Sequence, residues 1–251
     1  SRLRTRGHRR ESGVWLHHSL DGGIRSGVLG LWTDMAGIAL FDLDRTILGC
    51  NSATLWVKRQ VREGRMGRWD AVKMAATIGL YQLGMGNVDD GVRAAIRGLE
   101  GQLEADIRAQ TDLFWHEEVA HRVRPGVHSV LDKHRALGDP IWLLTGSSTY
   151  MSAQVIEALK LDGTICTTFE VKDGIFTGQG ELCYGAGKLV AALPILEARG
   201  VSLEQCTFYT DSYTDLPVLS VVGRPVAVHP DPRLARHARS QGWEIQDWGL
   251  A

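Results

Sequence analysis

The sequence has few cysteines and almost no net charge, and each of these features excludes a class of protein. The four cysteines, Cys50, Cys166, Cys183 and Cys206, are widely spaced and form no CxxC pair, so they predict neither a zinc site nor a redox motif. Reduced thiols in a chain of 251 residues are typical of a cytoplasmic protein. The formal net charge of −1 gives no reason to expect a nucleic acid or an anionic membrane as partner.

Long apolar runs are also missing from the sequence. The longest run, residues 71–85, is interrupted by Lys73 and Gln82, whereas a membrane-spanning helix needs about 18 consecutive apolar residues. We therefore expect no integral membrane contact.

The first 36 residues have an unusual composition. Five arginines fall within the first ten residues, and the apolar stretch that follows at residues 27–32 is shorter than the apolar core of about 7–15 residues in a signal peptide. One interpretation is a basic arm that binds nucleic acid or a membrane surface. We favour the other, a poorly ordered N-terminal extension over residues 1–36.

From residue 37 onward, short apolar runs alternate with helical patterns, and this alternation indicates the fold class. Strands that alternate with helices form a parallel sheet with helices on both faces, so we predict an α/β fold with a Rossmann-like, doubly wound sheet. An Asp173-Gly174 pair between β-rich segments adds one hairpin. The predicted strands are residues 37–42, 140–145, 206–211 and 225–229, and the predicted helices are residues 127–137, 148–159, 188–199, 215–222 and 232–241.

The segment between the first two predicted strands has a different character. Residues 52–124 contain almost no β-rich runs and are rich in alanine, leucine, arginine, glutamate and glutamine, which indicates three or four helices. This insertion is far longer than a βα connection of about 2–6 residues plus its helix. We therefore predict a helical cap domain at 51–124, inserted into an α/β core formed by 37–50 and 125–251.

Polar residues collect where the predicted strands end. Parallel strands bring their carboxyl ends to one edge of the sheet, and ligands of open α/β sheets bind there. Residues far apart in the sequence should therefore meet in one site. They are Asp42, Asp44, Thr145, Gly146, Ser147, Asp211 and Asp215, with Lys188 at the start of a helix.

Asp42 and Asp44 suggest a bound cation. Two acids at positions i and i+2, just beyond a buried strand, repel each other unless a cation lies between them. Oxygen ligands suit a hard divalent ion, and Mg²⁺ is the one most often used at phosphate sites. A single aspartate more often caps a helix or starts a turn. Acids on several strand ends, together with Thr145 and Lys188, favour the metal site.

Thr145-Gly146-Ser147 leads directly into a predicted helix. Hydroxyl groups and free backbone N–H groups at a helix start bind phosphate well. Taken alone, the segment is equally compatible with an ordinary helix cap after a glycine turn.

Taken together, these residues resemble four motifs of the haloacid dehalogenase superfamily of phosphohydrolases. Their order and spacing match the superfamily, and the cap lies between the first and second motifs. That placement is similar to the helical-cap branch that contains phosphoserine phosphatase, subfamily IB, and the resemblance covers residues 37–248. The matching segments are Phe41-Asp42-Leu43-Asp44-Arg45-Thr46, Leu143-Leu144-Thr145-Gly146, Gly185-Ala186-Gly187-Lys188 and Tyr209-Thr210-Asp211-Ser212-Tyr213-Thr214-Asp215.

The resemblance implies a role for each residue. Asp42 would be the nucleophile that forms an aspartyl-phosphate, and Asp44 would be the general acid and base. Thr145, Gly146 and Lys188 would bind the phosphoryl group. Mg²⁺ would be held by Asp42, by the backbone carbonyl of Asp44 and by Asp211. Asp215 would orient this metal site without binding the ion directly, through the residues that do or through water.

Three positions depart from phosphoserine phosphatases. Asn51 stands where they carry a glutamate that contacts the substrate's amino group, Thr214 replaces an asparagine, and Arg45 replaces a small residue. Arg45 and Asn51 are therefore candidates for substrate specificity. We expect Mg²⁺-dependent hydrolysis of a small phosphomonoester. The alternatives are phosphoserine phosphatase itself and a non-catalytic phosphate- or partner-binding protein on the same fold. The oligomeric state stays open.

Overall fold

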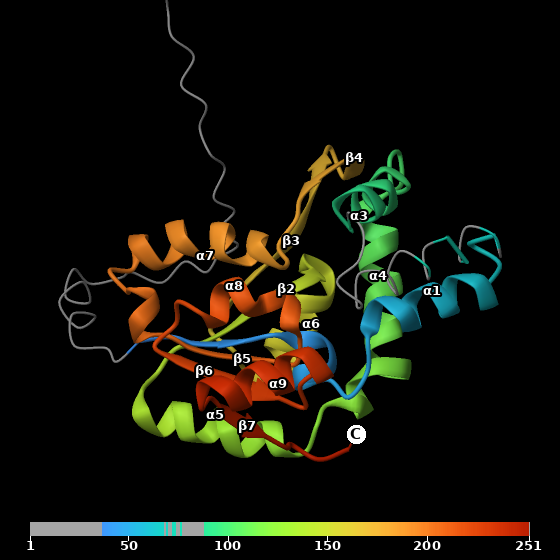
Figure 1. Ribbon diagram of the computed structural model, residues 1–251. Coiled ribbons are helices and arrows are strands. Elements are labelled where there is room, and N and C mark those ends of the chain that lie inside the picture. Colours follow the sequence, from blue (N-terminus) through green and yellow to red (C-terminus); the bar gives the residue numbers. More distant parts are fainter. Residues whose placement is uncertain (1–36, 68, 70–71, 74–75, 77–87, 251) are drawn as a thin grey trace, which may run out of the picture. The chain divides into compact units, whose positions relative to one another are not determined.

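The structure is a computed structural model that describes residues 37–67, 69, 72–73, 76 and 88–250 (Figure 1). The predicted extension 1–36 and nearly all of the apolar run 71–85 lie outside these residues. Among the described residues, no helix combines the length and apolar character needed to cross a membrane.

A seven-stranded sheet in the described part of the chain has the order β4-β3-β2-β1-β5-β6-β7, with β1 at its centre. All neighbouring strands are parallel except β3 and β4, which form the antiparallel hairpin. The predicted α/β fold is therefore confirmed. The strands are β1 Ala39–Phe41, β2 Ile141–Ser148, β3 Gly163–Lys172, β4 Ile175–Glu181, β5 Thr207–Thr210, β6 Arg224–Val228 and β7 Glu244–Gln246.

Helices cover both faces of this sheet. Apolar side chains of α5 and α6 belong to one core cluster, and those of α7, α8 and α9 belong to a second cluster on the opposite face. Because the two clusters take alternate residues of β1, the strand is buried from both sides. The helices are α5 Gly126–Leu137, α6 Thr149–Leu159, α7 Ala186–Ala198, α8 Leu216–Leu219 and α9 Pro232–Gln241.

The helix predicted over residues 215–222 is wrong in its extent. The chain forms a 3₁₀ turn, Tyr213–Asp215, followed by α8, which ends at Leu219. The Ser220 hydroxyl and backbone N–H both donate to the carbonyl of Leu216, at 2.8 and 2.9 Å, and the next N–H, that of Val221, donates to Val218 O at 3.1 Å in a tighter turn. The short edge strand β7 is an element that the sequence patterns did not indicate.

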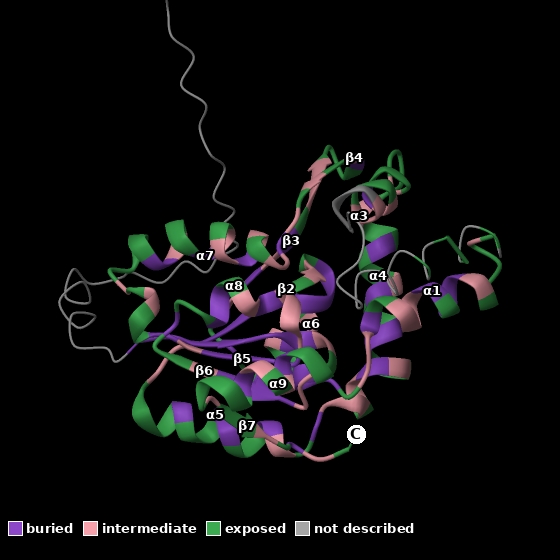
Figure 2. Cartoon of the chain, in the orientation of Figure 1, coloured by how far each residue is buried: buried purple, intermediate pink, exposed green. Residues whose placement is uncertain are grey.

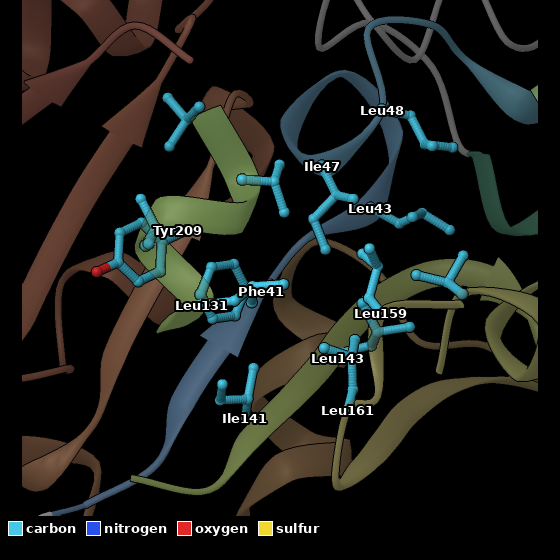
Figure 3. Packing of buried hydrophobic residues seen from close by; sticks show 14 of the residues in the cluster. Phe41, Leu43, Ile47, Leu48, Leu131, Ile141, Leu143, Leu159, Leu161 and Tyr209 are labelled. Atoms are coloured by element: carbon cyan, nitrogen blue, oxygen red, sulfur yellow. The ribbon is translucent and has the colours of Figure 1, made fainter. Parts of the chain in front are cut away.

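The core beneath the site is built around Phe41, the last residue of β1 (Figure 3). Its ring stacks on Tyr209 of β5 at a centroid distance of 4.5 Å, and both rings are fully or almost fully buried. Figure 2 shows that the central strands are largely buried in the same way. Burying one large apolar side chain contributes about 1.5–3 kcal/mol, so this packing holds the end of β1 firmly in place.

The described part of the insertion is helical. It contains α1 Ser52–Arg62, α3 Val88–Arg97 and α4 Glu104–Phe114, followed by a π turn, Trp115–Val119, and a 3₁₀ turn, Ala120–Arg122. Its two connections to the core lie side by side. Gly49 N–H donates to Arg122 O at 2.8 Å, and Arg124 N–H donates to Ile47 O at 2.9 Å. The division of the chain at 51–124 stays a prediction.

The insertion also contacts the β3–β4 hairpin. Three backbone hydrogen bonds join residues 101–104 to residues 174–176, with lengths between 2.8 and 3.0 Å. Ile107 of α4, Tyr150 of α6 and Phe176 of β4 form a small apolar cluster beside them. The insertion is thus attached to the core both at its connections and through the hairpin.

Candidate active site

Asp42 follows β1 directly, and its N–H donates to Tyr209 O at 2.9 Å. The next residues, Leu43–Ile47, form one wide turn in which Asp44 and Arg45 leave helical geometry; Arg45 has φ +62°. The turn returns Thr46 to the strand end. The Thr46 hydroxyl accepts the Asp211 N–H at 3.0 Å and lies 3.5 Å from a carboxylate oxygen of both Asp42 and Asp211. The first and fourth motifs are therefore joined through one buried hydroxyl.

Lys188 links two of the acids. Its Nζ donates to Asp42 Oδ1 and to Asp215 Oδ2, both at 2.7 Å, and its side chain is only 4% exposed. Burial by itself disfavours the ammonium, but the charges of Asp215 and Asp42 outweigh it and raise the pKa of Lys188. Lys188 therefore keeps its positive charge beside Asp42.

The acids are not fully neutralised by this lysine. Burial raises the pKa of Asp42 to about 6, in spite of Lys188, and repulsion from Asp215 adds to the rise. Burial and the charges of Asp42 and Asp215 raise the pKa of Asp211 well above its ordinary value, although Arg45 and Lys188 oppose the rise. Three nearby buried carboxylates, of which only Asp42 and Asp215 contact the ammonium of Lys188, favour an additional cation.

The residues present fit Mg²⁺. The donor set consists of oxygen atoms, and Asp215 Oδ1 is buried without a hydrogen-bond partner among the described residues. No three His, Cys, Asp or Glu side chains in the described ranges form a ready metal cluster. A cation held by Asp42 and Asp211 would thus need backbone or water ligands as well, which agrees with the expected contribution of Asp44 through its carbonyl.

Thr145 and Gly146 lie near the end of β2, where phosphate binding was predicted. Thr145 is 1% exposed, and its hydroxyl accepts the Ser147 N–H at 3.2 Å. A Cβ atom on Gly146 would lie 3.1 Å from the Cβ of Tyr184, so the backbone passes this point closely. Ser148 caps α6 by accepting the Met151 N–H at 3.3 Å.

Asp44 and Asn51 both lie at the start of α1. The Asp44 carboxylate accepts the Ser52 N–H at 2.8 Å, and burial raises the pKa of Asp44 although this bond lowers it. Asn51 Oδ1 accepts both the N–H and the hydroxyl of Thr54, at 2.9 and 2.8 Å, and thereby caps α1. Arg45 is exposed. The structure thus gives Asn51 a structural role that the sequence analysis did not consider.

Sequence reasoning also missed Thr210. This residue, at the end of β5, donates its hydroxyl proton to Asp215 Oδ2 at 2.6 Å. The sequence carries no clear signal for this contact, because the acid that the hydroxyl reaches is not the neighbouring Asp211 but Asp215, five residues further on.

The cap made by Asn51 leads to a stability prediction. We expect Asn51→Ala to lower the free energy of unfolding by about 1 kcal/mol, because two donors of α1 lose their acceptor. Asn51→Asp is the matched control, since a carboxylate accepts the same two bonds. Urea unfolding of the three proteins measures the difference. Equal losses in both variants would contradict the capping role.

The raised pKa values predict how Mg²⁺ stabilises the protein at different pH. A folded-state pKa of about 6 for Asp42, above its ordinary value of 3.8, stabilises the fold at low pH, and this contribution is lost as pH rises through about 6. Asp211 acts in the same direction. The Mg²⁺-induced rise in melting temperature should therefore increase between about pH 4 and 6. Thermal unfolding with Mg²⁺ or EDTA at equal ionic strength tests this, and a pH-independent rise would contradict it.

The sequence model of the haloacid dehalogenase-like hydrolases matches residues 39–220, which contain all four motifs. A Mycobacterium tuberculosis protein described as phosphoserine phosphatase SerB1 is 34% identical over 224 residues, covering 87% of this chain and 73% of the relative. A Neisseria meningitidis histidinol-phosphatase is 26% identical over 221 residues, covering 84% of this chain and 98% of the relative.

A solved structure shares the fold. The crystal structure of a Bordetella pertussis protein of unknown function has a TM-score of 0.76 and 28% identity, and it covers 84% of this chain and 98% of its own. The motif residues that the family model spans are those that meet at the carboxyl edge of the sheet. The chain therefore belongs to the haloacid dehalogenase-like hydrolase family and is a phosphatase.

Proposed function

We propose that this phosphatase hydrolyses a small phosphomonoester with Mg²⁺, through a covalent aspartyl-phosphate on Asp42. The observation that carries the proposal is the buried contact of Asp42 with Lys188 at 2.7 Å. It holds a carboxylate oxygen at the strand end beside a fixed positive charge. A carboxylate held beside a cation is suited to attack a phosphoryl group that the same cation attracts.

The first step transfers the phosphoryl group. An Asp42 carboxylate oxygen bonds to phosphorus while the bond from phosphorus to the alkoxide oxygen breaks, and Asp44 gives its proton to the departing alkoxide. Burial raises the pKa of Asp44, which favours the protonated form that this step requires. Thr145, Gly146 and Lys188 bind the phosphoryl oxygens.

The second step releases phosphate. Asp44, now a carboxylate, takes a proton from water, and the resulting oxygen attacks phosphorus and frees the Asp42 carboxylate. Asp42, the Asp44 carbonyl and Asp211 would hold Mg²⁺. The ion would supply positive charge that offsets the repulsion between the nucleophile and the phosphate. Asp215 would orient this site through Lys188 or through a water molecule. The free thiols of all four cysteines agree with a cytoplasmic enzyme, which is part of the same proposal.

The second candidate function is phosphoserine phosphatase itself, which the M. tuberculosis relative favours. Asn51 argues against it, because a neutral amide gives an ammonium group less attraction than a carboxylate does. Asn51 Oδ1 already accepts two bonds from Thr54, so its amide N–H groups are the part that suits a substrate acceptor. The N. meningitidis relative adds histidinol phosphate to the substrates worth testing.

The test is phosphate release from a panel of phosphomonoesters with Mg²⁺ or EDTA. The panel contains phosphoserine, histidinol phosphate, glycerol phosphates, lysophospholipid phosphates and sugar phosphates. Mg²⁺-dependent turnover of at least one compound supports the proposal, and its ranking identifies the substrate class. Phosphoserine turnover far above that of glycerol phosphate would favour the second candidate. Phosphate binding without turnover of any compound would instead indicate a non-catalytic binding protein.

A further inference from the structure

Thr210 is fully buried at the end of β5, and both functions of its hydroxyl are in use. The oxygen accepts the Ser212 N–H at 3.3 Å, and the single proton goes to Asp215 Oδ2 at 2.6 Å. A threonine hydroxyl has one proton to donate. Because the hydroxyl accepts the bond from Ser212 through a lone pair of its oxygen, its proton is available to donate to Asp215.

Both donors to Asp215 reach the same oxygen. Lys188 Nζ and the Thr210 hydroxyl contact Oδ2, while Oδ1 is buried without a hydrogen-bond partner among the described residues. Two donors from different elements restrict rotation of the carboxylate and keep Oδ1 as the oxygen available to water or a cation. Lys188 alone would restrict it less, because its ammonium is shared with Asp42.

We propose that Thr210 is a positioning residue for the Mg²⁺ site, acting through Asp215. This inference rests on the proposed function, because it takes Mg²⁺ as the ligand. Residues that orient the groups around a metal change affinity by about 10- to 100-fold when they are lost. Thr210 also lies directly before Asp211 in the chain. It is therefore linked to Asp211 through the backbone and to Asp215 through its hydroxyl, at the end of the same strand.

The expected result is a loss of Mg²⁺ affinity in Thr210→Val. Valine has nearly the shape of threonine without the hydroxyl, so the affinity for Mg²⁺ should fall by about 10-fold or more. Thr210→Ser keeps the hydroxyl and should bind Mg²⁺ within about 3-fold of the wild type. In steady-state assays the valine variant should need more Mg²⁺ for half-maximal activity, and its rate should largely recover at saturating Mg²⁺.

Titration calorimetry with Mg²⁺ alone tests the inference without relying on turnover. The matched control is Thr207→Val, which makes the same change at the other end of β5. Thr210→Ala replaces the valine variant if that protein does not fold. Wild-type affinity in Thr210→Val or Thr210→Ala, or affinity as weak in Thr210→Ser as in Thr210→Val, would overturn the positioning role.

A double variant separates positioning from a general structural effect. If Thr210 acts through Asp215, then Thr210→Val should weaken Mg²⁺ binding little further in an Asp215→Asn background. An equal additional loss in that background would overturn the inference. Failure of the wild type to bind Mg²⁺ would refute the metal dependence of the proposed function, whereas an unchanged Thr210→Val beside a wild type that binds refutes this inference only.

Discussion

Asp42→Asn should lower the rate of phosphate release by about 10⁴-fold or more, because the variant lacks the carboxylate that forms the covalent intermediate. The amide oxygen can still accept the hydrogen bond from Lys188, so the packing around the strand end should persist. Activity on the accepted substrate, measured at saturating Mg²⁺, gives the size of the effect. Acid trapping of labelled phosphate on the wild-type protein, and not on the variant, should locate the intermediate.

The stability of Asp42→Asn should not fall with its activity. Asp42 is a buried carboxylate whose pKa is raised by burial and by repulsion from Asp215, so its charged form costs stability in the absence of metal. Removing that charge should leave the free energy of unfolding in EDTA unchanged or increased above about pH 6. A loss of activity without a loss of stability would show that chemistry, and not folding, depends on Asp42.

Asp132→Asn provides the matched control for this experiment. Asp132 lies on α5 with its side chain 71% exposed, and the same change there should alter neither activity nor stability by much. Turnover by Asp42→Asn within about 10-fold of the wild type would refute the covalent mechanism. In that case the acid cluster would have to act on water.

The sequence was sufficient to predict the strands that carry the site. β1, β2, β5 and β6 are apolar runs followed by polar residues, and rows of buried apolar residues are the expected pattern for a parallel sheet covered on both faces. Because such strands end at a common edge, the meeting of Asp42 with Asp211 could be anticipated. The hydrogen bonds that these acids form could not be anticipated, because a bond such as that of Lys188 with Asp42 joins residues 146 positions apart in the sequence.

Other features depend on tertiary contacts that leave little trace in the sequence. β7 is three residues long with two polar residues, and its pairing with β6 defines it. β4 extends well beyond the Asp173-Gly174 turn, to Glu181, which pairs with Thr168 in the middle of β3. The left-handed backbone of Arg45 is unusual for a side chain of this kind, and the turn between Asp42 and Thr46 requires it.

Lys188→Met should have the largest effect on stability. The variant would leave Asp42 and Asp215 buried without the ammonium that both now contact at 2.7 Å. Breaking a buried ion pair by removing one partner costs about 3–5 kcal/mol. Urea unfolding in EDTA near pH 8 should show a loss of this size, and activity with Mg²⁺ should fall by about 100-fold or more, because a phosphoryl ligand is lost too.

The loss of stability should depend on pH. Lys188 is the main influence that lowers the pKa of Asp42, so its removal raises that pKa further above about 6. At a pH below this raised pKa, Asp42 of the variant takes up a proton and no longer carries an uncompensated charge. The difference in unfolding free energy between Lys188→Met and wild type should therefore be smaller at pH 5 than at pH 8. Lys133→Met, on the exposed side of α5, is the control and should show no such dependence.

A double variant tests whether the cost arises from the unpaired acid. Adding Asp42→Asn to Lys188→Met removes one of the two carboxylates that the lysine neutralises, so the double variant should be more stable than Lys188→Met alone at pH 8. A double variant that is no more stable would mean that the cost of Lys188→Met does not arise from the unpaired Asp42 carboxylate. Recovery of stability, with activity still absent, would instead show that Lys188 stabilises the fold by offsetting the charge of Asp42. The same pair of charges would then be needed both for catalysis and for the stability of the acid cluster.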